Sequence, residues 1–588
     1  MKKNLVFALV MVITLLLSAC SATEVEKPIV NDDTFVAGTY TGEGNGLSNS
    51  IGVEVTVSTE KIESIVFTEF NESDFTVDLA DQLIETIIEN NVAQADTIAG
   101  ATFTSRGTLE AVRDALSKAY VDGKEPDYTK IDVDNGEKTD LKNISTDVVV
   151  IGAGGAGMSS ALVAKNNGAE VIIVEKMPIV GGNTKFATGG LNAAETSIQK
   201  ALGIEDSVEL YYEDTMKGGG NLNNPSLVEL LAQKTKETVD WLIGLGADLS
   251  DVGRLGGASA NRAHRPTGGA AVGGEITDVL YENVQEAGIE VRLETTVIGI
   301  LSNNDEVTGV RVSTKDGEYD INAKAVIIAT GGFGANNELV ASFVPAFEGY
   351  GTTNHQGAIG DVIDFAKDLN VSFIDMEFIQ THPTVIPVKN YMITEAVRGN
   401  GAILVNRSAE RFVDELQTRK VVSDAELAQE GQTAFLVFDQ GVRESLSAIE
   451  KYYNKGFLLE SDTIEGLAEQ MGVPAEQLKA TIDTYNSYVA NENDPEFGRT
   501  NFARPIENGP YYSVEVGPAV HHTMGGVEID VETQVYNEAG EVIKGLYAAG
   551  EVTGGVHGNN RLGGNSLSDI TTYGRIAGEN AAHYSKSE

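Results

Sequence analysis

Five short stretches in the C-terminal half of the chain combine arginine and histidine with glycine, threonine or glutamate. They read QTHPT from Gln380, MITEAVRG from Met392, QTRK from Gln417, HHTMGG from His521 and NRLGGNS from Asn560. Guanidinium and imidazole groups hold carboxylates through charge-assisted hydrogen bonds. An acid among such groups can also protonate a substrate. A single arginine or histidine on a loop also fits a structural role, so the combination is the indicative feature.

A strand–turn–helix–strand pattern that begins near residue 148 could bind a cofactor beside these residues. Residues 148–151 form an apolar run typical of a buried parallel strand. Gly152, Gly154 and Gly157 then form G-x-G-x-x-G before a predicted helix, and a second predicted strand ends at Glu175. Such glycines let backbone N–H groups approach a pyrophosphate, while the terminal acid meets a ribose hydroxyl. The pattern predicts a dinucleotide site; a glycine-rich turn in another α/β protein is the alternative.

Composition and charge limit the classes of function. The 588 residues suffice for about three to four domains, and 41% apolar with 22% charged residues is typical of a globular protein. The formal net charge of −45 argues against nucleic acid as a partner, because phosphates would be repelled. Cys20 is the only cysteine, which excludes intramolecular disulfides, cysteine-ligated iron–sulfur clusters and C-x-x-C-H haem attachment. Electron transfer would therefore depend on flavins, and we predict no metal site.

The first twenty residues have the pattern of an export signal. Lys2 and Lys3 precede an apolar run over 5–17, which is shorter than a membrane span. The run ends in LSAC, and this resembles a bacterial lipoprotein signal peptide in which Cys20 is lipidated. The resemblance implies a tether over 21–33 and a lipid-anchored protein on the extracytoplasmic face of the cell membrane. A plain secretory signal with an incidental cysteine is the alternative.

Residues 34–127 are predicted to form a small α+β domain. We expect strands at 35–40, 51–57 and 61–67, and amphipathic helices over 77–90 and after residue 102. The motif from Asp96 to Thr102, DTIAGAT, resembles the flavinylation motif of FMN-binding domains, which implies covalent FMN on Thr102. Ala99 departs from that motif, where serine or threonine is usual, and a helix-capping turn is the alternative. The polar stretch 128–145 is predicted to be a linker.

Glycine-rich turns after further predicted strands support the fingerprint. Together with it, stretches such as GGNT from Gly181 and AAGE from Ala548 resemble the FAD-binding half of the fumarate reductase/succinate dehydrogenase flavoprotein family, over about residues 146–585. The FAD contacts that the resemblance implies are Gly152, Gly154, Gly155, Gly157, Glu175, Gly182, Asn183, Thr184, Gly190, Gly332, Asp361, Glu551, Ser566 and Leu567. No histidine precedes Arg262, so FAD is expected to be noncovalent, and no second fingerprint for NAD is present.

The five stretches are most similar to soluble flavocytochrome-type fumarate reductases. The resemblance implies that Arg561 and His522 hold one substrate carboxylate near the carbon that accepts hydride. It implies that His382 and Thr394 hold the other carboxylate, with Met392 against the substrate. Arg419 is then the proton donor. That role is unusual for a group with a pKa above about 12, and it requires rapid reprotonation.

Glu395 and Arg398 resemble the relay that returns a proton to Arg419. An i,i+3 surface ion pair is the alternative interpretation of these two residues. Chain order predicts an α/β fold in which a Rossmann-like FAD-binding domain, 146–374 and 520–588, carries an inserted α+β cap domain, 375–519. The cap would contain helices near 463–471 and 474–489 and would exclude water from the hydride step.

The leading hypothesis is flavin-dependent reduction of fumarate to succinate, with electrons passing from a membrane quinol or flavin donor to FMN, then FAD, then substrate. Reduction of another enoate, of the urocanate, methacrylate or cinnamate type, is the second hypothesis; the predicted second carboxylate site favours fumarate. A ketosteroid dehydrogenase on the same fold is disfavoured by the paired arginine and histidine residues. A noncatalytic electron-shuttling flavolipoprotein would have no need for Arg419, Arg561 and His522 together.

Overall fold

The computed structural model describes residues 35–45, 50–70, 77–93, 102–121, 142–303, 306–387 and 389–587. These residues form two compact units, divided between Lys138 and Thr139. The predicted signal peptide with Cys20, the tether, residues 96–101 of the FMN motif and residues 128–141 of the predicted linker lie outside the described residues. None of the helices in the described ranges is long and apolar enough to cross a membrane.

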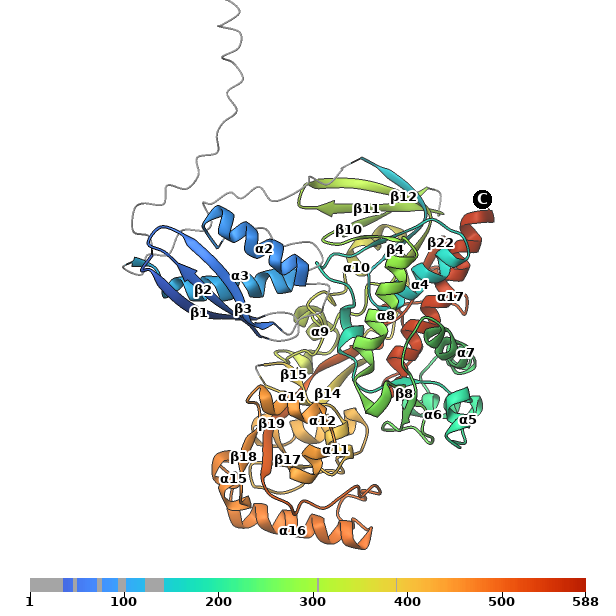
Figure 1. The fold of residues 1–588 in the computed structure, drawn as a ribbon. Coiled ribbons are helices and arrows are strands. Elements are labelled where there is room, and N and C mark those ends of the chain that lie inside the picture. Colours follow the sequence, from blue (N-terminus) through green and yellow to red (C-terminus); the bar gives the residue numbers. More distant parts are fainter. Residues whose placement is uncertain are drawn as a thin grey trace, which may run out of the picture. The chain divides into compact units, whose positions relative to one another are not determined.

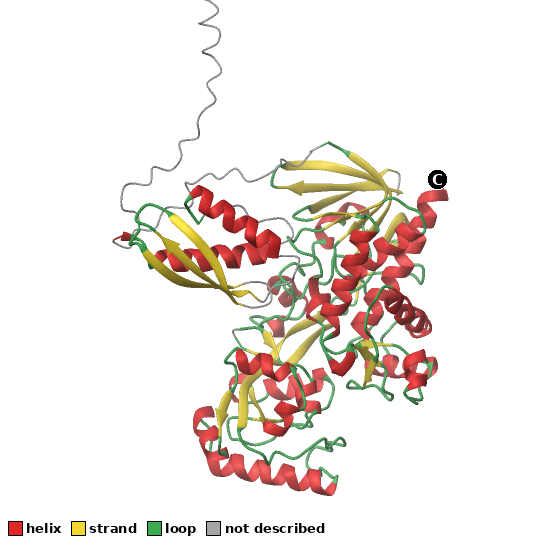
Figure 2. Ribbon diagram, viewed as in Figure 1, coloured by secondary structure: helices red, strands yellow, loops and turns green. Residues whose placement is uncertain are grey.

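The N-terminal unit is an antiparallel three-stranded sheet with two helices (Figures 1 and 2). Its elements are β1 (Gly38–Asn45), β2 (Ser50–Val57), β3 (Ile62–Phe70), α2 (Val77–Asn90) and α3 (Thr102–Ser117). Alternate residues of β2 from Ile51 to Val57 are buried against α2 and α3, as a half-buried strand requires. Helix α3 packs directly on β1, because a Cβ at Gly42 would lie 2.1 Å from the carbonyl oxygen of Ala111. The predicted first strand therefore starts later than expected, at Gly38, and Phe35 forms only an isolated bridge to Tyr120.

The second unit is built on an eight-stranded sheet of order β10-β11-β22-β12-β4-β5-β9, with β21 on β22. Strands β12, β4, β5 and β9 run parallel to one another, and β22 runs parallel to β12. The strands are β4 (Ile144–Ile151), β5 (Val171–Val174), β9 (Glu290–Arg292), β10 (Thr296–Asn303), β11 (Glu306–Thr314), β12 (Gly317–Ile328), β21 (Gln534–Tyr536) and β22 (Val542–Ala548). Strand β5 is buried throughout, which explains its run of aliphatic residues.

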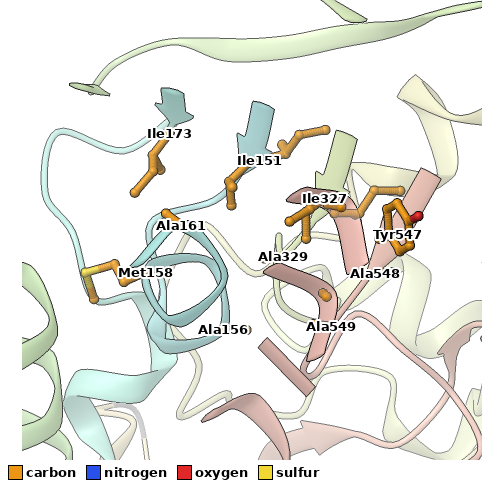
Figure 3. Packing of buried hydrophobic residues seen from close by; sticks show 14 of the residues in the cluster. Ile151, Ala156, Met158, Ala161, Ile173, Ile327, Ala329, Tyr547, Ala548 and Ala549 are labelled. Carbon is orange, nitrogen blue, oxygen red and sulfur yellow. The ribbon is translucent and has the colours of Figure 1, made fainter. Parts of the chain in front are cut away.

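Two helices fit closely against this sheet. Helix α4 (Gly155–Asn166) follows β4, and helix α17 (Asn565–Ser587) packs along it. The backbones approach because α17 has glycines at the contact: a Cβ at Gly578 would lie 2.2 Å from the carbonyl oxygen of Ser160. Figure 3 shows Ala161 of α4 directed toward the strand residues Ile151 and Ile173. This βαβ core fixes the turn that follows β4.

A second sheet and the helices around it carry most of the residues predicted to act on a substrate. Its order is β15-β14-β19-β17-β16, with β18 also on β19. The strands are β14 (Ile379–Ile386), β15 (Tyr391–Met392), β16 (Ile403–Val405), β17 (Ala434–Asp439), β18 (Leu459–Ser461) and β19 (Tyr511–Thr523). Around it lie α11 (Ala396–Gly399), α12 (Arg419–Leu427), α13 (Gln440–Glu444), α14 (Ala448–Asn454), α15 (Ile464–Met471) and α16 (Ala475–Asn491) (Figure 1). Both helices expected near 463–489 are present.

The remaining elements connect these sheets. They are β6 (Leu191–Asn192), β7 (Asp251–Gly253), β8 (Ala263–Arg265), β13 (Phe373–Ile374), β20 (Gly526–Val527), α5 (Ser197–Ala201), α6 (Val208–Gly218), α7 (Pro225–Gly244), α8 (Val272–Glu286), α9 (Asn337–Phe343) and α10 (Val362–Phe365). The predicted fold class is confirmed: a mixed α/β fold with a parallel dinucleotide-binding core, an α+β insertion and a small N-terminal α+β unit. The domain boundaries given above stay predictions.

Candidate active site

The turn between β4 and α4 has the geometry that a pyrophosphate needs. Gly152 has φ +105°, and a Cβ on Gly157 would lie 1.9 Å from the carbonyl oxygen of Gly152, so neither position accepts another residue. A Cβ on Gly154 would meet only the carbonyl oxygen of Gly181, 3.9 Å away. The N-cap residue Gly154 has no side chain to cap α4, and the Thr184 hydroxyl accepts the N–H of Gly155 at 3.0 Å. The other N–H groups of the first turn lie beside this open position.

Glu175 closes the βαβ unit on the other side of the turn. Its carboxylate accepts hydrogen bonds from the backbone N–H groups of Ala153, at 2.7 Å, and Met177, at 2.8 Å. Burial raises the pKa of this carboxyl, although both hydrogen bonds oppose the shift. Each carboxylate oxygen keeps a lone pair that can accept a ribose hydroxyl.

The second glycine turn is tied to the distant Glu551. Gly182, Asn183 and Thr184 lie in a short 3-10 helix, and the Asn183 amide donates to Glu551 at 3.0 Å. Glu551 also accepts the N–H of Thr523 at 3.1 Å. These contacts bring four of the predicted FAD residues to the C-terminal edge of the parallel strands, where ligands of open α/β sheets bind.

Other predicted FAD residues surround this edge. Gly332 packs against Thr523, with a Cβ placed 2.0 Å from its hydroxyl, and Gly190 has φ +134°. Ser566 and Leu567 lie in the first turn of α17, where backbone N–H groups lack helical partners. Asp361 forms an ion pair with Lys176, directly after Glu175. Thr102 is the first residue of α3, in the other unit.

One glutamine joins the two arginines of the predicted substrate site. The Gln380 side-chain oxygen accepts a hydrogen bond from Arg419 Nη1, at 3.1 Å, and from Arg561 Nη2, at 3.2 Å. Its amide donates to Asn560 Oδ1, at 2.9 Å, and to the carbonyl oxygen of Arg561, at 2.8 Å. Gln380 lies on β14 and Arg419 at the start of α12, so the second sheet and the FAD-binding half meet here.

Arg561 is a buried cation with no carboxylate against it. It is 5% exposed, its Nε makes no hydrogen bond to any residue described here, and none of the described acids forms an ion pair with it. Burial and the neighbouring charge of Arg419 lower the pKa of Arg561 to about 9. A buried charge is stable only when it is paired. The arrangement therefore favours binding of an anion.

The histidines near the arginines form two pairs, His382 with His521 and His522 with His557. His382 and His521 lie together, with ring centroids 5.2 Å apart. The backbone N–H of Thr384 donates to His382 Nδ1, at 3.3 Å, so the neutral ring carries its proton on Nε2 and can donate it to a carboxylate. Burial and the charge of Arg419 lower the pKa values of His382 and His521 well below the usual range.

His522, one of the two histidines predicted to hold substrate, is buried, and its Nε2 makes no hydrogen bond to any described residue. Its Nδ1 lies 3.4 Å from Glu551, and its ring contacts His557. The pairing of β14 with β19 skips His521, since Gln380 pairs with His522 and Thr381 with Val520. His521 is thus the extra residue of a β-bulge, a feature that redirects side chains near active sites. Half-buried His521 becomes a second candidate for the carboxylate contact predicted for His522.

Thr394 and Met392 lie on the chain that follows β14. The hydroxyl of buried Thr394 is 3.4 Å from that of Thr188, and its N–H donates to the Tyr452 hydroxyl at 3.1 Å. Half-buried Met392 pairs with Val385 at the edge of the sheet. Both side chains remain predicted substrate contacts.

The predicted proton relay forms a buried charge cluster. Arg419 Nε donates to Glu395 at 3.2 Å. Burial alone would raise the pKa of Glu395, but the charges of Arg419 and Arg398 outweigh it and lower that pKa. Arg398 is only 1% exposed and donates to the carbonyl oxygen of Glu415. The alternative of a surface ion pair between Glu395 and Arg398 is therefore wrong.

These residues fit FAD. The open position beside Gly154, the first turn of α4, the buried Glu175 and the first turn of α17 suit a dinucleotide; Gly190 and Gly332 leave its edge free of side chains. FAD supplies hydride when reduced. The chain supplies cations for carboxylates and, at Arg419, a proton.

Sequence reasoning missed Gln380 and His521 as functional candidates. Gln380 stood in the quoted QTHPT stretch, but its role depends on partners 39 and 181 positions away. His521 is the neighbour of the predicted residue His522, and only the β-bulge in β19 gives the two side chains different directions. The sequence shows both residues, but it does not show which way their side chains point.

Comparisons with known proteins agree with the geometry. Residues 147–567 match the family described as FAD binding domain, and residues 46–117 match the FMN-binding domain. The chain is 52% identical to a "Fumarate reductase (cytochrome)" of Shewanella frigidimarina, over 75% of this chain and 78% of that protein. It is 33% identical to a "Urocanate reductase" of Eggerthella lenta, over 92% of both chains.

A solved structure supports the same relationship. The open conformation of a flavocytochrome c3 fumarate reductase superposes with a TM-score of 0.68 and 42% identity, covering 78% of this chain and 84% of that chain. The protein belongs to the FAD-binding flavoprotein family that includes the flavocytochrome-type fumarate reductases, and it carries an FMN-binding domain ahead of that fold.

Proposed function

We propose that this protein reduces fumarate to succinate. The observation that carries the proposal is the buried Arg561, which faces Arg419 across Gln380 and has no acidic partner among the described residues. A dicarboxylate would supply the missing negative charge. Relatives at 52% identity that are named fumarate reductases support this substrate class.

The residues would act in the following way. Arg561, with His521 or His522, holds the carboxylate beside the carbon that receives hydride. His382, through its Nε2 proton, and Thr394 hold the other carboxylate. This binding polarises the double bond, and Arg419 gives a proton to the second carbon, which completes the C–H bonds of succinate.

Two of the three guanidinium nitrogens of Arg419 are occupied by neighbouring side chains. Nε donates to Glu395 and Nη1 to Gln380, while Nη2 has no partner among the described residues. Nη2 is therefore the proposed proton-donating atom. Glu395, already bonded to this arginine, returns the proton after each turnover.

Electrons would enter from a membrane quinol or flavin donor through FMN on Thr102 and pass to FAD. Cys20 would anchor the chain by lipid on the extracytoplasmic face of the cell membrane. The sequence motifs and the FMN-binding domain support this route. Cys20→Ser should move the protein from the membrane fraction to the soluble fraction; an unchanged distribution would contradict the lipid anchor.

A second enoate is the alternative substrate, since a urocanate reductase matches this chain over 92% of its length. Steady-state rates with reduced viologen should be compared for fumarate, urocanate, acrylate, methacrylate and cinnamate, using the full chain. We expect the highest kcat/KM for fumarate, because His382 and Thr394 provide a second carboxylate site. Absence of fumarate turnover, with turnover of a monocarboxylate, would replace the leading proposal with the alternative.

A further inference from the structure

Behind Arg419, helix α12 carries two buried polar side chains to which the proposed mechanism gives no role. Ser423 and Glu426 follow Arg419 at spacings of four and seven residues, so the three share one face of the helix. Ser423 and Glu426 are both completely buried. Glu426 lies in the last turn, one residue before the helix ends at Leu427 and close along the chain to exposed Ala428.

The polar atoms of this group are left without protein partners. Both carboxyl oxygens of Glu426, the Ser423 hydroxyl, and Nε and Nη2 of Arg398 make no hydrogen bond to any residue in the described ranges. Arg398 and Glu426 are near enough to shift each other's pKa. Buried polar atoms of this kind are normally satisfied by ordered internal water.

Charge and burial bring the acid and the guanidinium closer in proton affinity. Burial raises the pKa of Glu426 well above its usual range, and Arg398 offsets this only in part. Burial lowers the pKa of Arg398, although Glu395 and Glu426 oppose the shift. Burial thus favours the protonated form of Glu426, and Arg398 releases its own proton more readily than an exposed arginine does.

Two further charged groups act on Arg398: Arg419 adds to the fall of its pKa, and Glu415 opposes it. Strands β14 and β19 pack against the helix and carry His382 and His521, which burial keeps neutral. The 3-10 turn after α12 carries exposed Glu430. On the exposed face of the helix, Lys420 and Asp424 form an ion pair with each other.

We propose that Glu426, with Ser423 and an internal water, is the next proton-holding group beyond Arg398 in the supply of protons to Arg419. This inference rests on the proposed reduction of fumarate. After Arg419 has protonated the substrate, Glu395 passes it the proton taken from Arg398. The O–H bond of Glu426 then breaks, an N–H bond re-forms on Arg398, and bulk water at the end of α12 reprotonates the carboxylate. One proton moves per turnover, and every group returns to its initial state.

Full-length holoprotein with Glu426→Gln, Glu426→Asp or Asp424→Asn tests this assignment. Glu426→Gln keeps the volume but cannot cycle a proton, whereas Asp424→Asn makes the same chemical change on the exposed face of α12. For Glu426→Gln we expect kcat for fumarate to fall by about tenfold or more, with KM changed less than about twofold. The solvent deuterium isotope effect on kcat should rise, and the loss should be larger at pH 8 than at pH 6. Glu426→Asp should recover part of the rate, and Asp424→Asn should match wild type.

Two outcomes would overturn the assignment. The first is a Glu426→Gln protein with wild-type kcat and isotope effect. The second is a fall in kcat with an unchanged isotope effect and pH profile, which would identify a purely structural role. If Glu426→Gln does not fold, an unchanged isotope effect in Glu426→Asp serves as the refuting result. Failure of wild-type protein to reduce fumarate would instead refute the proposed function, so the two failures are distinguishable.

Discussion

Replacing Gln380 with leucine removes the side chain that contacts both arginines of the candidate site. The substitution deletes four hydrogen bonds: two accepted from Arg419 and Arg561, and two donated to Asn560 and the Arg561 backbone. Leucine is apolar and ends one bond short of the glutamine amide atoms, so both the acceptor and the donor are lost. Because Gln380 is 3% exposed, solvent does not readily replace the lost oxygen.

The expected loss follows from the two bonds to guanidinium groups. A hydrogen bond to a charged group contributes about 1.5–3 kcal/mol, so the pair contributes about 3–6 kcal/mol to holding the two cations in place. When substrate binds, its carboxylates also hold the two guanidinium groups, so part of this free energy is recovered. If half is lost at the transition state, about 1.5–3 kcal/mol, kcat/KM for fumarate falls by about 10- to 150-fold.

The assay is steady-state reduction of fumarate by reduced viologen, with FAD content measured on the same samples. Gln417→Leu is the matched control, since Gln417 is exposed and, among the described residues, its side chain bonds only to Asp414; it should keep kcat/KM within about twofold of wild type. A Gln380→Leu protein with normal FAD content and a kcat/KM within threefold of wild type would refute the reasoning that this glutamine positions the arginines.

Three further predictions concern single residues. Arg419→Ala should abolish turnover while FAD remains bound, measured by flavin absorbance; retained activity would overturn its role as proton donor. Thr102→Ala should lose the FMN adduct in a mass spectrum of the intact protein, and an adduct that persists would move the attachment elsewhere. His382 is held neutral by burial and Arg419, so below pH 6.5 only the unfolded chain protonates it and the free energy of unfolding falls, by about 1.4 kcal/mol between pH 7.5 and 5.5. In denaturant titrations, the free energy of unfolding of His382→Asn should fall by that much less than that of wild type over this pH interval. An equal fall in both proteins would count against a neutral buried His382.

The sequence predicted the parts of the fold and site that depend on near neighbours. The turn from Gly152 to Glu175 lies within one βαβ unit, so its glycines and its acid are recognisable in a single stretch. Helix α2 also begins and ends as expected, at Val77 and Asn90, because its apolar face repeats with helical spacing.

The directions of side chains and the pairing of strands in the second sheet could not be predicted in the same way, because they depend on residues far apart in the sequence. His521 and His522 are chemically identical, and the bulge that separates them arises from the register between β14 and β19. Nothing in the sequence around Gln380 marks it as functional. Its role becomes visible only in the fold, where Arg419 and Arg561 both donate to its side-chain oxygen. Burial of Arg398 likewise depends on the carbonyl oxygen of Glu415 and on α12, which local spacing does not encode.

The pairing of Ile379 with Thr523 bears on how parts of the chain could be exchanged. Strand β14 begins at Ile379 and β19 ends at its direct strand partner Thr523, so the two ends of the segment between them, which covers most of the predicted insertion 375–519, lie side by side. The proposed proton donor and most of the proposed carboxylate contacts lie in this segment, whereas the glycine turns and Arg561 lie outside it. A chimaera joined at these two positions would exchange acid and substrate preference together while leaving the cofactor fold continuous. Such an exchange would join the two parts at one point of the fold and leave the glycine turns of the flavin site unchanged.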